Sequence, residues 1–261
     1  MKAYSYILLL FIVILSACRK EIDIDLNEAN PRIVIAANYN ASADSVHVRV
    51  TKTGSFFDQF SEEKINNAVV TIYGPDEVPV LIPLIGDGIY KAAYTNVQIG
   101  ANYKMVVSVD GKEYEATSVL MPTLQTTTIN YQPFVAGEVG GPNYIIYYRY
   151  QDFSGIGNYY KAIRTYNNER EDKFGQFSIG DDKLTDGNEV ILSSIGFYDA
   201  GDEVTFEIQS INEQTHKYYS QLASGTSQNA AAQGNPDYVW TNQALGYFNA
   251  YTTSSLSITI Q

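Results

Sequence analysis

The chain has 261 residues, 29 of them acidic and 17 basic, and its net charge of −12 at pH 7 excludes nucleic-acid binding through a basic surface. Hydrophobic residues make up 45% of the chain, enough for one large core or two smaller ones. The single cysteine excludes an internal disulfide, and 22 tyrosines with many β-branched residues favour strands over helices.

The first 18 residues carry the most specific motif. An apolar run over residues 7–15 follows Lys2, and it is too short to span a bilayer, because a membrane helix needs about 20 apolar residues. Small residues and a cysteine come next, in the order Leu15-Ser16-Ala17-Cys18. This order predicts a bacterial lipoprotein signal peptide over residues 1–17, with a fatty acid such as palmitate on Cys18. The alternative is an ordinary secretory peptide with a chance cysteine.

Residues 18–30 are expected to form a lipid-anchored tether. Charged and aliphatic residues alternate in it, so that Glu21, Asp23 and Asp25 share one face of an extended chain. The pattern fits an edge strand docked through its isoleucines. It also resembles the sorting signal that follows the lipidated cysteine in outer-membrane lipoproteins of Bacteroidetes, and both interpretations can hold together.

Residues 31–122 alternate apolar and polar side chains in short segments separated by turn residues. Seven strands are predicted here, over residues 32–39, 45–52, 68–73, 78–83, 88–94, 102–109 and 112–119. Asp110-Gly111 predicts a tight hairpin between the last two, because both central residues of a type I′ turn need positive φ. This number of strands, without a helical period, predicts an immunoglobulin-like β-sandwich.

A second β-sandwich domain is predicted over residues 123–261, after Pro122 ends the preceding strand. Its first two strands, over residues 143–151 and 158–166, are rich in tyrosine. These tyrosines fit the core of a sandwich, and they also fit a surface platform that stacks on sugars. One short helix is predicted near residues 213–224, where apolar residues recur at helical spacing.

Candidate residues for chemistry are few. His47 and His216 lack a cysteine or histidine partner at metal-ligand spacing, so we expect no metal site and no cofactor. A group of possible calcium ligands departs from the spacing of an EF-hand loop; it comprises Asp182, Asp186, Gly187, Asn188 and Glu189. No nucleophile elbow or phosphate loop occurs in the sequence, and we expect no enzyme. A hydrolase built on two distant carboxylates stays open as an alternative.

The aromatic residues near the C-terminus are the candidate binding surface. We expect Tyr238, Trp240 and Tyr247, which follow the turn residues 234–236, to form an exposed patch that touches a transporter or stacks on a ligand. The alternative is that Trp240 and Phe248 fill the end of the second sandwich, because a single tryptophan in a β protein is usually core.

Several segments together resemble a domain-of-unknown-function family of Bacteroidetes outer-membrane lipoproteins, often encoded beside TonB-dependent transporters. They are the lipoprotein motif, residues 21–26, residues 32–35, and the late blocks 234–236 and 244–251. Members commonly carry a proline-rich insertion before the last block, and residues 230–236 are shorter and leaner here. The resemblance implies a surface-facing accessory lipoprotein and supplies no catalytic residues.

The sequence thus predicts an all-β, lipid-anchored protein of the outer membrane with two β-sandwich domains. Its expected role is a non-catalytic accessory or ligand-binding partner of a TonB-dependent transporter in nutrient uptake. A carbohydrate-binding surface lectin and a hydrolase that uses a carboxylate pair are the alternatives.

Overall fold

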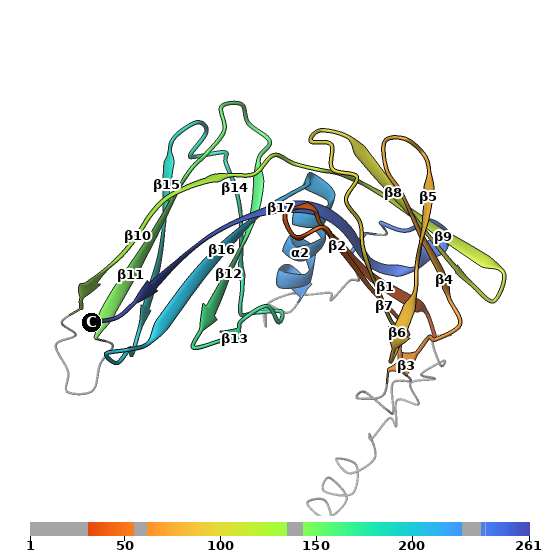
Figure 1. Cartoon of the computed structure of the whole chain (residues 1–261), viewed down its shortest axis with the longest axis horizontal. Coiled ribbons are helices and arrows are strands. Elements are labelled where there is room, and N and C mark those ends of the chain that lie inside the picture. Colours follow the sequence, from red (N-terminus) through yellow and green to blue (C-terminus); the bar gives the residue numbers. More distant parts are fainter. Residues whose placement is uncertain (1–30, 55–61, 135–142, 226–235, 238) are drawn as a thin grey trace, which may run out of the picture.

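The structure, a computed structural model, describes residues 31–54, 62–134, 143–225, 236–237 and 239–261. These residues form two β-sandwiches side by side, with α2 (Glu213–Gly225) between them (Figure 1). The all-β prediction with a short helix is therefore confirmed. Within the described part of the chain, no helix has the length and apolar character needed to cross a membrane.

The first sandwich packs a four-stranded sheet against one half of a longer sheet. The smaller sheet has the order β5-β4-β8-β9, formed by β4 (Val69–Tyr73), β5 (Pro79–Ile82), β8 (Asn102–Val109) and β9 (Lys112–Val119). The facing strands are β1 (Ile33–Asn40), β2 (Ser45–Lys52), β3 (Glu63–Lys64), β6 (Leu84–Gly86) and β7 (Ile89–Ala93). Alternation buries every second side chain of β1 and β8, including Ile35 and Met105, in one hydrophobic cluster. This is the immunoglobulin-like sandwich expected from the sequence.

Tight turns with positive φ close two hairpins of this sandwich. Asp110 and Gly111 between β8 and β9 have φ of 50° and 79°, and Asp87 and Gly88 between β6 and β7 have φ of 52° and 71°. Positive φ at both central residues is the requirement of a type I′ turn. The hairpin predicted at Asp110-Gly111 is confirmed.

The second sandwich packs a three-stranded sheet against the other half of the longer sheet. The small sheet has the order β10-β11-β15, formed by β10 (Gln125–Pro133), β11 (Tyr144–Gln151) and β15 (Glu189–Gly196). The facing strands are β12 (Tyr159–Tyr166) and β16 (Glu203–Ile211), and the short β13 (Glu169–Arg170) and β14 (Ser178–Asp181) extend from β12. Tyr148, Tyr150 and Tyr160 are buried between the sheets with Phe206. Core packing thus accounts for these tyrosines.

The last strand, β17 (Leu245–Thr259), belongs to both sandwiches. Residues 245–251 pair in parallel with β1, and residues 252–259 pair antiparallel with β16. Figure 1 shows this strand crossing from one sandwich to the other. The predicted division gave all of residues 123–261 to the second sandwich, whereas Trp240 and Phe248 are buried in the hydrophobic cluster of the first. The predicted division differs from the structure because the first half of β17 pairs with β1 and so belongs to the sheet of the first sandwich.

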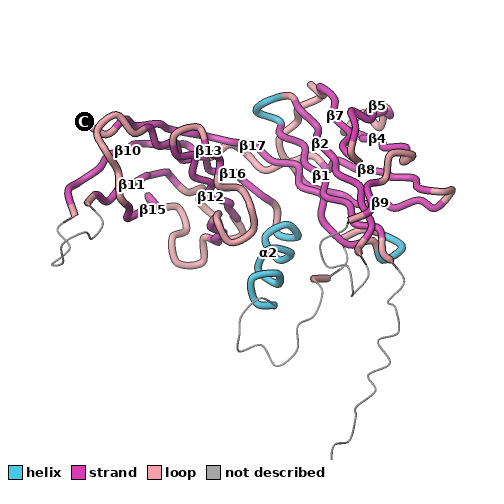
Figure 2. Tube along the Cα trace, turned by 90° about the horizontal axis from the view of Figure 1, so that it is seen from below, coloured by secondary structure: helices cyan, strands magenta, loops and turns pink. Residues whose placement is uncertain are grey.

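Three short helical elements lie at the ends of these strands in the described part of the chain. The 3₁₀ turns η1 (Ala41–Ala43) and η2 (Thr241–Gln243) follow β1 and precede β17. Asn212 caps α2, because its Oδ1 accepts a 2.8 Å hydrogen bond from the Thr215 N–H. The helix contacts β12, β14 and β17, and Figure 2 shows it on one side of the long sheet, between the two sandwiches. Its position agrees with the helix predicted near residues 213–224.

Candidate functional site

A pocket of about 500 Å³, which we call the junction pocket, lies where α2 meets the long sheet. Side chains from β1, β2, β12, β16, β17 and α2 line it, together with residues 170–177. Six of the lining side chains are aromatic: Phe174, Phe177, Tyr218, Tyr219, Tyr247 and Tyr251. Small-molecule sites typically have volumes of about 300–1,000 Å³ and combine aromatic walls with polar or charged side chains.

The alternation of β17 places two of these tyrosines. Phe248 faces the cluster of the first sandwich, so Tyr247 and Tyr251 point to the opposite face of the sheet, where α2 lies. Tyr218 and Tyr219 on the helix each meet Tyr247 with ring centroids 5.3 Å apart. Separations of about 4.5–7 Å are favourable for aromatic pairs. Helix and sheet are therefore joined through the walls of the pocket.

Lys161 on β12 is the unusual residue of the junction pocket. Its side chain is buried, with only 7% of the residue exposed, and its Nζ lies 4.0 Å from the ring centroid of Phe177 and 4.8 Å from that of Tyr219. The Lys161 Nζ also makes one long polar contact, at 3.5 Å, to the hydroxyl of Tyr219. Among the described residues no carboxylate forms an ion pair with it. Burial therefore lowers the pKa of Lys161 to about 8.

The two carboxylates that act electrostatically on this lysine, Asp172 and Glu207, are held by an arginine. Arg170 donates two hydrogen bonds of 2.8 Å to Glu207, and its Nε lies 3.3 Å from Asp172. Burial opposes ionisation of Glu207, but hydrogen bonds from Arg170 and Gln209 hold its pKa below the usual value. Arg170 thus pairs with both carboxylates, and neither of them forms an ion pair with Lys161.

Replacement of Lys161 by methionine is expected to stabilise the protein. Burial lowers the lysine pKa from 10.5 to about 8, which corresponds to up to about 3 kcal/mol of unfolding free energy lost at pH 7. The loss is complete below pH 8 and disappears as the pH rises toward 10.5, because the folded protein then buries a neutral amine. Urea unfolding of both proteins at pH 7 and pH 10 measures it. A less stable Lys161→Met, with a difference independent of pH, would contradict this account.

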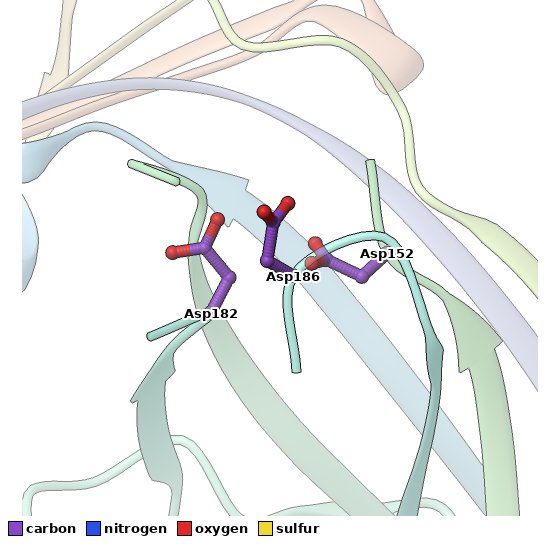
Figure 3. A group of neighbouring side chains, drawn as sticks. All are labelled: Asp152, Asp182 and Asp186. Atoms are coloured by element: carbon purple, nitrogen blue, oxygen red, sulfur yellow. The ribbon is translucent and has the colours of Figure 1, made fainter. Parts of the chain in front are cut away.

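A second group of polar side chains lies at one end of the second sandwich. Asp152, Asp182 and Asp186 bring carboxylate oxygens within 4.8 Å of one another (Figure 3). Only Asp182 and Asp186 belong to the calcium-ligand group suggested by the sequence; Glu189 instead contacts Arg149 at 3.4 Å.

These carboxylates accept hydrogen bonds from N–H and O–H groups of the protein itself. Asp182 accepts hydrogen bonds from the N–H groups of Gly157 and Asn158, at 3.0 and 3.1 Å. Asp152 accepts from the Tyr160 hydroxyl at 2.9 Å, and Asp186 accepts from Gly155 at 2.6 Å. The geometry is that of a loop held in place by acceptors.

Replacement of Asp182 by asparagine is expected to cost about 1–3 kcal/mol of unfolding free energy at pH 7, because two loop N–H groups lose a charged acceptor. Burial opposes ionisation, but these N–H groups hold the Asp182 pKa below its usual value of 3.8. The stabilisation is therefore present above that value and is lost as the pH falls through the lower folded pKa. Thermal unfolding from pH 7 to pH 3 measures the difference. Asp186→Asn, at an exposed residue with one such bond, is the control with a smaller expected loss.

Comparison with known proteins places the chain in a family. A family model described as a domain of unknown function (DUF4249) matches residues 19–257. The chain belongs to this family. Membership in DUF4249 confirms the resemblance to a domain-of-unknown-function family that the sequence indicated. A search of curated proteins finds no match to the chain.

Among solved structures, the chain is similar to the FN1–FN3 domains of chicken CNTN1, with 9% sequence identity and a TM-score of 0.27. The similarity covers 69% of this chain and 61% of that structure. A score of this size is too low to show a shared fold.

The predicted site residues have different positions in the structure. Tyr247 lines the junction pocket. Trp240 is not part of an exposed patch: it is 2% exposed, and its indole N–H donates a 3.1 Å hydrogen bond to the Ile35 carbonyl inside the first sandwich. Cys18 and Tyr238 lie outside the described residues. Burial in the first core therefore replaces the expected role of Trp240 at a binding surface.

Lys161 was missed by sequence reasoning. It lies in the predicted strand 158–166, between the buried Tyr160, which faces the core, and the half-buried Ala162. A lone lysine in a strand with two buried faces is the signal that could have revealed it. Its surroundings depend on α2 and on residues 170–177, which no local pattern connects to this strand.

Proposed function

We propose that the protein is a non-catalytic, lipid-anchored binding protein of the outer membrane that holds a small molecule in the junction pocket and works with a TonB-dependent transporter. The observation that carries the binding role is the aromatic pocket around Lys161, a residue that is 7% exposed and whose ammonium has no ion pair among the described residues. Burying an unpaired charge costs several kcal/mol. Residues that lower the stability of a protein in this way are typical of functional sites.

The membrane location rests on the N-terminal motif. Leu15-Ser16-Ala17-Cys18 places the single cysteine of the chain where a lipoprotein signal requires it. The match of residues 19–257 to DUF4249 begins directly after that cysteine. The transporter partner rests on the family resemblance stated for the sequence.

Replacement of Cys18 by alanine is expected to abolish acylation and to leave the protein unprocessed or released from membranes, because the lipid is attached to this sulfur. Labelling of cells with palmitate, followed by membrane fractionation, measures both effects. Label retained on Cys18→Ala would contradict the lipoprotein assignment.

The transport role is tested by purifying the lipidated protein from membranes of its own host. We expect it to co-purify with a large β-barrel, and native mass spectrometry should detect a small molecule on the accessory protein. Tyr247→Ala should keep the barrel and lose the small molecule, because Tyr247 joins the helical and sheet walls of the pocket. Recovery of the wild-type protein with neither barrel nor small molecule would contradict the proposal.

The alternatives make different demands. A neutral glycan would leave the buried Lys161 ammonium without a counter-charge, because this ammonium lies 4.8 Å from the ring centroid of Tyr219 inside the pocket. A hydrolase needs two carboxylates free to meet a substrate, whereas the clustered Asp152 and Asp182 accept hydrogen bonds from Tyr160, Gly187 and Gly157. These observations favour the binding protein over both.

A further inference from the structure

The chemistry of the junction pocket indicates what it binds. The Lys161 ammonium has three N–H donors, and its polar contact among the described residues is the 3.5 Å approach to the Tyr219 hydroxyl. The two aromatic faces beside it attract the charge but accept no full hydrogen bond. Within the part of the chain that the structure describes, the ammonium therefore lacks partners for a full set of hydrogen bonds.

Among the described residues no carboxylate forms an ion pair with Lys161, although Asp172 and Glu207 act on it electrostatically. Glu207 and Asp172 are both engaged by Arg170, at 2.8 and 3.3 Å. Lys173 also lines the pocket and adds a second positive charge. In a chain with net charge −12, this lining is a local positive site, and fields of this kind concentrate anions.

The rest of the pocket suits a ring or an apolar body. Tyr218, Tyr219, Tyr247 and Tyr251 stand on α2 and β17, and Phe177 closes the side next to Lys161. Aromatic walls bind flat or apolar groups by stacking and burial. Gln209, Asn38 and His47 are neutral polar side chains among the lining residues.

We infer that the ligand of the junction pocket is a small organic acid, whose carboxylate pairs with Lys161 and whose ring or apolar body lies against the tyrosines of α2 and β17. This inference rests on the proposed binding function and names the class of its ligand. Aromatic acids and sugar acids share this chemistry, because each presents a carboxylate on a ring.

Binding of the acid also changes the protonation of the site. Burial gives free Lys161 a pKa of about 8, and a paired carboxylate raises it, so binding above that pH takes up a proton. The affinity should fall by up to about tenfold per pH unit above pH 8. The other charged or titratable groups that line the pocket or act on Lys161 are His47, Arg170, Asp172, Lys173, Glu207, Tyr218, Tyr219, Tyr247 and Tyr251. Burial, with Lys91 and Arg49, lowers the pKa of His47, so this residue stays neutral in that range.

The experiment measures dissociation constants for four probes by NMR titration at pH 7: phenylacetate, its neutral amide phenylacetamide, glucuronate and glucose. Wild type, Lys161→Met, Tyr247→Ala and Lys104→Met are compared. Lys104 is the matched control, since it lies on a strand over the ring of Tyr73 at 4.6 Å but outside the junction pocket. A charged hydrogen bond predicts that the wild type prefers an acid over its neutral counterpart by about tenfold to a hundredfold.

The expected result is a preference for at least one acid, its loss in Lys161→Met and its retention in Lys104→Met. Which acid binds distinguishes an aromatic acid from a sugar acid. Equal binding of acid and neutral probe, with both lost in Tyr247→Ala, overturns the inference and leaves the pocket as a binding site. Absence of binding by all four probes at millimolar concentration also overturns the inference, whereas the co-purification experiment tests the proposed function without these probes.

Discussion

Trp240→Ala is expected to lower the free energy of unfolding by about 3–5 kcal/mol, the usual cost of removing a buried tryptophan. The side chain is 2% exposed, its ring lies 6.4 Å from that of Phe248, and its N–H donates to the Ile35 carbonyl. Removal leaves a cavity between β1 and the start of β17 and takes a hydrogen bond from the Ile35 carbonyl. Urea unfolding followed by circular dichroism measures the loss.

The control for this prediction is Phe197→Ala, because Phe197 is 65% exposed. Removal of an exposed aromatic side chain should change stability by less than about 0.5 kcal/mol. If Trp240→Ala melts like the wild type, the burial of Trp240 between β1 and the start of β17 is contradicted. Weakened ligand binding with unchanged melting would restore the interpretation of Trp240 as part of a binding surface.

Gly246→Ala is expected to cost about 3 kcal/mol or more, since it combines backbone strain with a clash. Gly246 has a φ of +102°, and a Cβ there would lie 2.1 Å from the Ile35 carbonyl oxygen. That oxygen belongs to the β1 residue paired with Gly246, so β17 would have to separate from β1. Thermal unfolding measures the loss of stability.

Gly201→Ala separates the two causes. Gly201 has a similar φ of +97°, but a Cβ there meets nothing within 4 Å. We expect this variant to lose only about 1–2 kcal/mol from strain. If Gly246→Ala and Gly201→Ala lose equal stability, the clash of β17 with β1 makes no contribution to the loss in Gly246→Ala.

Local signals in the sequence predicted the parts of the fold that depend on local chemistry. The hairpin at Asp110-Gly111 follows from positive φ, and the helix at Glu213–Gly225 follows from helical spacing. Strands with strict alternation, such as β8, were predicted at their observed bounds. In each case the determining residues lie within one element.

Long-range pairing explains what was missed. Ile35 and Gly246 are adjacent strand partners although more than two hundred residues separate them in the chain, and alternation within β17 does not reveal a parallel partner. The same pairing explains why Trp240 was assigned to the second sandwich. Lys161 was missed because the rings around it come from α2, β17 and residues 170–177.

The measurement that tests the central claim most directly is a crystal structure of the lipidated protein purified from its own membranes. We predict electron density for a small molecule in the junction pocket, with an acidic group within hydrogen-bond distance of the Lys161 Nζ and a ring or apolar part beside Tyr247. A junction pocket that contains only water, while a ligand occupies another surface of the same protein, would contradict the account.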